Sequence, residues 1–161
     1  MSQSDRISVL FICMGNICRS PLAEGVFRQK ANERGVIDRL SLDSAGTGGW
    51  HVGEPADPRM QQTAERHGIK LTSAARQVHR DDFERFDYLI CMDRANLKNV
   101  KAIGAPEEKL SLLLDYLPDP PTREVPDPYY GGPDGFERVF ELVDAACDAL
   151  LDRLVAERSS A

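Results

Sequence analysis

The chain has 161 residues, enough for one sizeable hydrophobic core and too few for two ordinary domains, so we expect a single domain over residues 1–161. Hydrophobic residues make up 42% and charged residues 29%, which excludes a disordered or collagen-like chain. Lys and Arg total 20 against 26 Asp and Glu, so the net charge of −6 has the wrong sign for a protein that binds nucleic acid. Any binding of phosphate must therefore come from a local pocket.

The first residues of the chain do not have the pattern of an export signal, because an acidic residue precedes a short apolar run that Ser8 interrupts. No stretch approaches the roughly 20 apolar residues of a membrane span. We therefore expect a cytoplasmic protein with no membrane association. In that compartment the four cysteines would be reduced thiols rather than a disulfide framework.

Strand-like and helical segments alternate along the chain. Residues 7–12 are apolar and rich in β-branched side chains, which predicts a buried strand. A helix is expected to open at Ser20, with Pro21 in its first position. Residues 40–44 and 88–92 predict two further strands, each followed by turn residues and a more helical stretch.

The C-terminal segment predicts a long amphipathic helix, while the Pro-dense residues 118–133 predict a loop. Apolar residues recur at the helical period between residues 136 and 154. Buried strands that alternate with helices favour a doubly wound α/β fold, with three α/β/α layers and a small parallel sheet of about four strands. Because such folds bind ligands beyond the carboxyl ends of their strands, we expect a phosphate-binding loop after the first strand.

The turn after that strand has the parts of an anion cradle. It offers the thiol of Cys13, a flexible position at Gly15, the guanidinium of Arg19 and the N-terminus of a helix. The same positive field favours the thiolate form of Cys13, which would then be a nucleophile directed at bound phosphorus. A nucleotide-binding loop is excluded, because its second Gly and its Lys are missing. The structural alternative is that Cys13 is only a buried thiol at the end of a strand.

The segment from Val9 to Phe27, VLFICMGNICRSPLAEGVF, resembles the signature of the low-molecular-weight protein tyrosine phosphatases. The resemblance extends over the whole chain, through residues 43–47, 66–69, 86–93 and 127–131. It implies that Cys13 attacks phosphorus, Arg19 stabilises the phosphoryl group and Asp127 protonates the leaving oxygen. Spacing alone does not select Asp127, because Asp115, Asp119 and Asp134 lie in or near the same loop. The implied mechanism needs neither a metal nor a cofactor.

The resemblance also implies roles for the residues around these three. Trp50, Tyr129 and Tyr130 would line the substrate pocket, and the two adjacent tyrosines could hold a substrate ring between them. Many relatives have His where this chain has Ser73. Phosphate would be bound by Met14, Gly15, Asn16, Ile17, Cys18, Arg19 and Ser20. The loop would be supported by Asn16, Ser20 and Ser44, and Ser20 could also, or only, cap the helix.

The remaining cysteines divide into two groups. Cys91 and Cys147 fall at buried positions of a strand and a helix, where they are expected to be core residues. Cys18 lies in the cradle close to Cys13, and we hypothesise that oxidation forms a Cys13–Cys18 disulfide that protects the nucleophile. No spacing of His with Cys or acidic residues suggests a metal site. Asp93 is expected to cap a helix. Arg76, His79 and Arg80 would form either a solvated face or a contact for acidic substrate loops.

These observations predict an enzyme that hydrolyses phosphotyrosine in proteins, and small aryl phosphates, through a cysteinyl-phosphate. Its partners would be tyrosine-phosphorylated proteins and oxyanions such as phosphate, without nucleic acid or membrane, and we expect a monomer. One alternative is a thiol-dependent arsenate reductase on the same scaffold, which would need a relay of further cysteines. Another is a module that binds phosphotyrosine without hydrolysing it.

Overall fold

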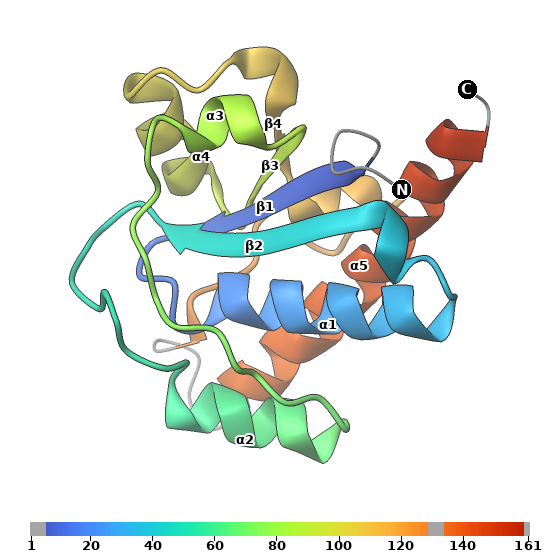
Figure 1. Ribbon diagram of the computed structural model, residues 1–161. Helices are drawn as coiled ribbons and strands as arrows, with labels where there is room; N and C mark the ends of the chain where they lie inside the picture. The colour runs from blue at the N-terminus through green and yellow to red at the C-terminus, as the bar shows by residue number, and fades with distance from the viewer. Residues whose placement is uncertain (1–5, 129–133, 160–161) are drawn as a thin grey trace.

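The computed structural model describes residues 6–128 and 134–159, and within these ranges the chain forms a four-stranded parallel sheet (Figure 1). The strands are β1 (Ile7–Cys13), β2 (Leu40–Gly46), β3 (Tyr88–Cys91) and β4 (Leu110–Leu112), in the spatial order β2-β1-β3-β4. The order reverses beside β1, which is the topological switch point where doubly wound folds bind ligands.

Helices cover both faces of the sheet, which confirms the predicted α/β class (Figure 1). On one face, α1 (Arg19–Glu33) packs against the long α5 (Gly135–Ser159), and α2 (Pro58–Arg66) lies beside α5. On the other face lie α3 (Asp82–Arg85) and α4 (Arg94–Ala102). Short 3₁₀ helices are η2 (Ile37–Arg39), η3 (Glu107–Lys109) and η4 (Leu113–Tyr116).

Strand β1 is buried on both faces because its apolar side chains alternate between two cores. Val9 and Phe11 belong to the core shared with α1 and α5, whereas Leu10 and Ile12 belong to the core under α3 and α4. All four side chains are fully buried. This double burial fixes the position at which β1 ends and the following loop begins.

One detail of the predicted elements was wrong, and the position of one strand had not been located. Helix α1 begins at Arg19 rather than Ser20, with Cys18 as its N-cap residue, so Pro21 occupies the third helical position. Proline is tolerated there because the first-turn N–H groups have no partner within the helix. The sheet has the predicted number of about four strands, but the position of the fourth strand, β4, was not located from the sequence because its three residues are too few to show a period. No helix of the described residues is long and apolar enough to span a bilayer.

The backbone after β2 runs alongside the loop that follows β1. The N–H of Thr47 donates to the carbonyl of Cys13 over 2.9 Å, and the N–H of Gly48 donates to that of Met14 over 2.9 Å. Gly46 makes this approach possible, because a Cβ there would lie 2.8 Å from the carbonyl oxygen of Met14. The end of β2 therefore supports the outer side of the loop.

Candidate active site

The loop between β1 and α1 places a cysteine sulfur beneath hydrogen-bond donors. Cys13 ends β1 and is only 2% exposed. Asn16 has φ of 58°, a left-handed conformation that Asn tolerates better than most residues. This turn directs the N–H of Asn16 at the Sγ of Cys13 over 3.3 Å. The hydroxyl of Ser20 lies 2.9 Å from the same sulfur.

The side-chain amide of Asn16 determines which way the Ser20 hydroxyl points. The backbone N–H of Arg76 donates to Oδ1 of Asn16 over 2.9 Å, and an N–H can meet only the oxygen of an amide. The amide nitrogen Nδ2 is thereby turned to Ser20 Oγ, which accepts from it over 2.8 Å. The hydroxyl proton of Ser20 is then free to point at Cys13 Sγ. Ser20 therefore lies in the first turn of α1 and its hydroxyl contacts the loop, whereas the alternative that it caps α1 is wrong because Cys18 is the N-cap residue.

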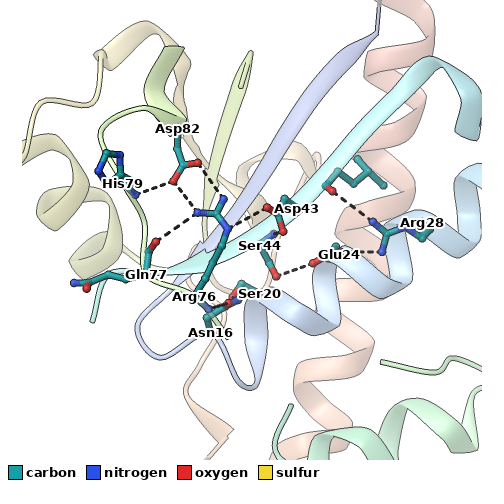
Figure 2. A network of polar contacts seen from close by, with 11 residues as sticks. Asn16, Ser20, Glu24, Arg28, Asp43, Ser44, Arg76, Gln77, His79 and Asp82 are labelled. Atoms are coloured by element: carbon teal, nitrogen blue, oxygen red, sulfur yellow. Dashed lines mark hydrogen bonds and ion pairs between the residues drawn. The ribbon is translucent and has the colours of Figure 1, made fainter. Parts of the chain in front are cut away.

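Ion pairs with Asp82, which is buried, and with Asp43 hold the partly buried Arg76 in place (Figure 2). Its guanidinium donates two hydrogen bonds to Asp82, of 3.0 and 3.1 Å, and a third of 3.0 Å to Asp43. The side chain of Asp82 is 2% exposed and also accepts the N–H of His79. Burial disfavours the charged guanidinium, but the two carboxylates outweigh it and raise the pKa of Arg76. The interpretation of this arginine as part of a solvated face is therefore wrong.

Ser44 does not join this cluster, although it was predicted to support the loop. Its hydroxyl donates to Oε1 of Glu24 over 2.7 Å, and Glu24 in turn accepts from Arg28 over 2.8 Å (Figure 2). Arg28 also donates to the carbonyl of Leu42 over 3.5 Å. Ser44 therefore connects β2 to α1, and its influence on the loop is through the position of that helix.

The guanidinium of Arg19 is almost completely buried and is held by two acceptors. Its Nη1 donates to Asp93 over 2.6 Å and to the carbonyl of Val125 over 3.0 Å. Burial acts against the charged form, but the Cys13 sulfur and the Asp93 carboxylate outweigh it and raise the pKa of Arg19. Asp93 also forms a capping box with Asn96 at the start of α4, which confirms its predicted role as a cap. One carboxylate thus fixes both a helix and the arginine.

The structure brings Asp127 to the same end of the sheet. Its side chain is half-buried, and its charge contributes to raising the pKa values of Arg19 and Cys18, both of which lie in or beside the loop. Trp50 lies on the loop after β2 with 72% of its surface exposed. Tyr129 and Tyr130, the other two predicted pocket residues, lie outside the described residues.

All four cysteines are free and buried. Burial, with a smaller contribution from Asp57, raises the pKa of Cys18 to about 12. Burial likewise raises the pKa of Cys91 to about 12 and that of Cys147 further still. Cys91 and Cys147 are fully buried in the two cores, which confirms that they are core residues.

Among residues 6–128 and 134–159 no group of three or more His, Cys, Asp and Glu side chains could hold a metal ion. The histidines make other contacts. His67 stacks on Phe140 with 3.8 Å between ring centroids and contacts Glu137 over 2.6 Å, whereas His51 pairs with Glu54.

Comparison with known proteins agrees with this geometry. The model of the family described as low molecular weight phosphotyrosine protein phosphatase matches residues 8–160. The low molecular weight protein-tyrosine-phosphatase YfkJ of Bacillus subtilis is 42% identical over 94% of this chain and 98% of its own length. Its crystal structure superposes with a TM-score of 0.90, covering 94% of this chain and 96% of that one.

Two further solved structures are similar. A protein tyrosine phosphatase from Entamoeba histolytica, with Hepes in its active site, gives a TM-score of 0.89 at 37% identity, covering 94% of this chain and 99% of that one. An arginine phosphatase from Drosophila gives 0.84 at 32% identity, covering 91% and 96%. The fold and these similarities define the class of protein tyrosine phosphatases. The chain belongs to the low molecular weight phosphotyrosine protein phosphatase family and is an enzyme of that family.

Sequence reasoning missed the residues that hold the loop from a distance. Arg76 lies 60 positions from Asn16, and Asp93 lies 74 positions from Arg19. Asp82 would have been suspected only if its burial were known, because a buried acidic residue is nearly always paired. Nothing in the sequence alone indicates that it is buried.

Proposed function

We propose that this enzyme hydrolyses phosphotyrosine in proteins, and small aryl phosphates, through a cysteinyl-phosphate on Cys13. The observation that carries the proposal is the pair of donors, the Asn16 N–H and the Ser20 hydroxyl, at 3.3 and 2.9 Å from the Cys13 sulfur. Hydrogen bonds to sulfur favour its ionised form, which is the nucleophile. A purely structural buried thiol would need neither donor.

In the first step the Cys13 thiolate attacks phosphorus, and the bond from phosphorus to the tyrosyl oxygen breaks. Arg19 stabilises the charge on the transferring phosphoryl group, since its guanidinium can grip two oxygens. Its anchoring to Asp93 and Val125 supports this role, because a side chain that is already oriented loses little conformational entropy on binding. Backbone N–H groups of the residues from Met14 to Ser20 would surround the remaining oxygens.

Asp127 gives its proton to the leaving tyrosyl oxygen. Without this proton the oxygen would leave as a phenoxide, which is a poor leaving group because the pKa of a phenol is about 10. In the second step Asp127 takes a proton from water, the water oxygen attacks phosphorus, and the sulfur–phosphorus bond breaks. Phosphate leaves and the thiolate is regenerated, with the Ser20 hydroxyl as a donor to the departing sulfur. Every step uses a group of the chain, so neither a metal nor a cofactor has a role in it.

Substrate choice is proposed to depend on the depth of the pocket. Trp50, Tyr129 and Tyr130 would form aromatic walls around a phosphotyrosine ring, and a shorter phosphoserine would not reach the sulfur. The free, buried cysteines suit a reducing compartment, which supports action in the cytoplasm. The enzyme is proposed to act as a monomer, since the chain itself supplies every residue of the mechanism.

The alternative activities fit the site less well. An arsenate reductase needs a relay of further thiols that carries oxidation away from the loop, and Cys91 and Cys147 are fully buried in the two cores with raised pKa values. A non-catalytic binding module would not need an acid near Arg19. Phosphoarginine deserves inclusion among the test substrates, because the Drosophila relative is an arginine phosphatase.

The test is hydrolysis of para-nitrophenyl phosphate and of matched phosphotyrosine, phosphoserine and phosphoarginine peptides, in buffer with chelator. We expect turnover of the aryl phosphate and of phosphotyrosine, lost in Cys13→Ser and reduced about 10²- to 10⁴-fold in Asp127→Ala. Activity that survives in Cys13→Ser would contradict the mechanism. Tight binding of phosphotyrosine without turnover would indicate the binding module.

A further inference from the structure

The exposed large apolar side chains of the described residues gather beside the proposed site. They are Met14, Trp50, Val52 and Ile103, which are between 40% and 72% exposed. Met14, Trp50 and Ile103 line one cavity of about 410 Å³, and Val52 lies outside it. Apolar surface that is left in water and concentrated in one concave place is typical of a binding site.

One wall of this groove belongs to the phosphate loop and its support. Met14 follows Cys13 directly, and the N–H of Gly48 donates a hydrogen bond to the Met14 carbonyl over 2.9 Å. The Trp50 ring lies against Gly48, where a Cβ would come within 1.8 Å of Cζ3, so the ring covers the loop backbone. The groove is therefore continuous with the outer side of the loop that carries Cys13.

The opposite wall is the C-terminal end of α4. Asn99, Val100 and Ala102 line it, followed by Ile103 just after the helix. None of the ten residues around the groove is charged, although 29% of the chain is charged. An apolar occupant loses no hydrogen bond on entering such a groove, whereas a charged one would lose its water without gaining an ion pair.

We infer that this groove receives an apolar side chain of the substrate polypeptide, within three residues of the phosphotyrosine. The inference rests on the proposed function and adds a sequence preference to it. A peptide extends by about 3.3 Å per residue, so one whose phosphotyrosine occupies the loop has neighbouring side chains within reach of the groove beside it. The volume accommodates a leucine or phenylalanine side chain.

The experiment compares pairs of phosphotyrosine peptides that differ only in having Leu or Ala at one position. This position is moved in turn through the three residues before and the three residues after the phosphotyrosine. We expect kcat/KM to be about 10-fold higher with Leu than with Ala at one position. Ile103→Ala should lower this preference to about threefold, and Ile103→Asp should abolish it. The control Val52→Ala removes an exposed apolar side chain outside the groove, 59% exposed against 40% for Ile103, and should leave the preference unchanged.

The small substrate separates this inference from the proposed function. Para-nitrophenyl phosphate has no neighbouring residues, so its kcat/KM should stay within about twofold in all three variants. If the aryl phosphate is hydrolysed and no position prefers Leu, the groove inference is wrong while the proposed function stands. Equal losses on both substrates in Ile103→Ala would also overturn it. The inference would also be overturned if sedimentation showed that the protein is a dimer and that Ile103→Asp dissociates it. The occupant of the groove would then be a second copy of the chain.

Discussion

The ion pair between Arg76 and Asp82 offers a sharp test of how the loop is held. In Arg76→Ala, the Asp82 carboxylate loses both guanidinium hydrogen bonds and keeps the N–H of His79. Removing one partner of a buried pair costs about 3–5 kcal/mol, but the Arg76 side chain is 31% exposed, so solvent screening lowers the expected loss of stability to about 2–3 kcal/mol.

The same substitution should reduce catalysis. Residue 76 would still be held by its backbone, since Gly46 donates to its carbonyl over 2.8 Å. The hydrogen bond from the N–H of residue 76 to Asn16 would be weaker. A weakening of about 1 kcal/mol corresponds to a roughly fivefold fall in kcat. Arg76→Lys, which keeps the charge, should recover part of both losses.

Urea unfolding and aryl phosphate hydrolysis measure the two effects. Asp82→Asn removes the buried charge, so the double variant with Arg76→Ala should be more stable than the sum of the single changes predicts, by about 1–2 kcal/mol. Arg34→Ala is the matched control, because its pair with Asp152 is exposed on both sides and should contribute less than about 1 kcal/mol. An Arg76→Ala protein with wild-type stability and kcat would refute the reasoning.

Three further predictions concern the acid and the cysteines. Asp127→Asn should slow hydrolysis of phenyl phosphate about 10²- to 10⁴-fold and that of an aryl phosphate with a more acidic phenol much less, so equal losses across leaving groups would contradict its role as the acid. Burial raises the pKa of Cys91 from 9.0 to about 12, so the folded protein holds a proton that the unfolded chain releases in this range. The stability contributed by this difference is present below pH 9 and is lost as the pH rises toward 12, by about 1.4 kcal/mol per unit. Between pH 9 and 11 the free energy of unfolding, measured with urea, should therefore fall less steeply with pH in Cys91→Ala than in the unchanged protein. The same slope in both proteins would contradict the raised pKa of Cys91. Peroxide should oxidise Cys13 before Cys18, whose raised pKa keeps it a neutral thiol, and peptide mapping should then find the two linked. Overoxidised Cys13 without a linked peptide would reject the protective disulfide.

The parts of the site that are local in sequence could be predicted. Cys13, the turn after it and Arg19 lie within seven residues between a buried strand and a helix. The local sequence pattern was therefore enough to predict that they belong to one site. The class of fold followed from the alternation of buried strands and helices, because a doubly covered parallel sheet needs continuous apolar runs.

The contacts that hold the loop could not be predicted in this way. The Arg19–Asp93 and Asn16–Arg76 contacts depend on how distant segments meet at the edge of the sheet. Ser20 misled the prediction of the helix start for a related reason. A Ser before Pro is typical of a cap, but its hydroxyl is engaged by Cys13 and Asn16, and tertiary contact overrode the local preference.

The central claim is that the phosphoryl group passes through the sulfur of Cys13. Rapid acid quenching of the enzyme during hydrolysis of an aryl phosphate, followed by peptide mass mapping, tests it directly. We expect one phosphoryl group on the peptide that contains Cys13 and none in the Cys13→Ser protein. A phosphorylated peptide from elsewhere in the chain, or continued turnover by Cys13→Ser, would contradict the account.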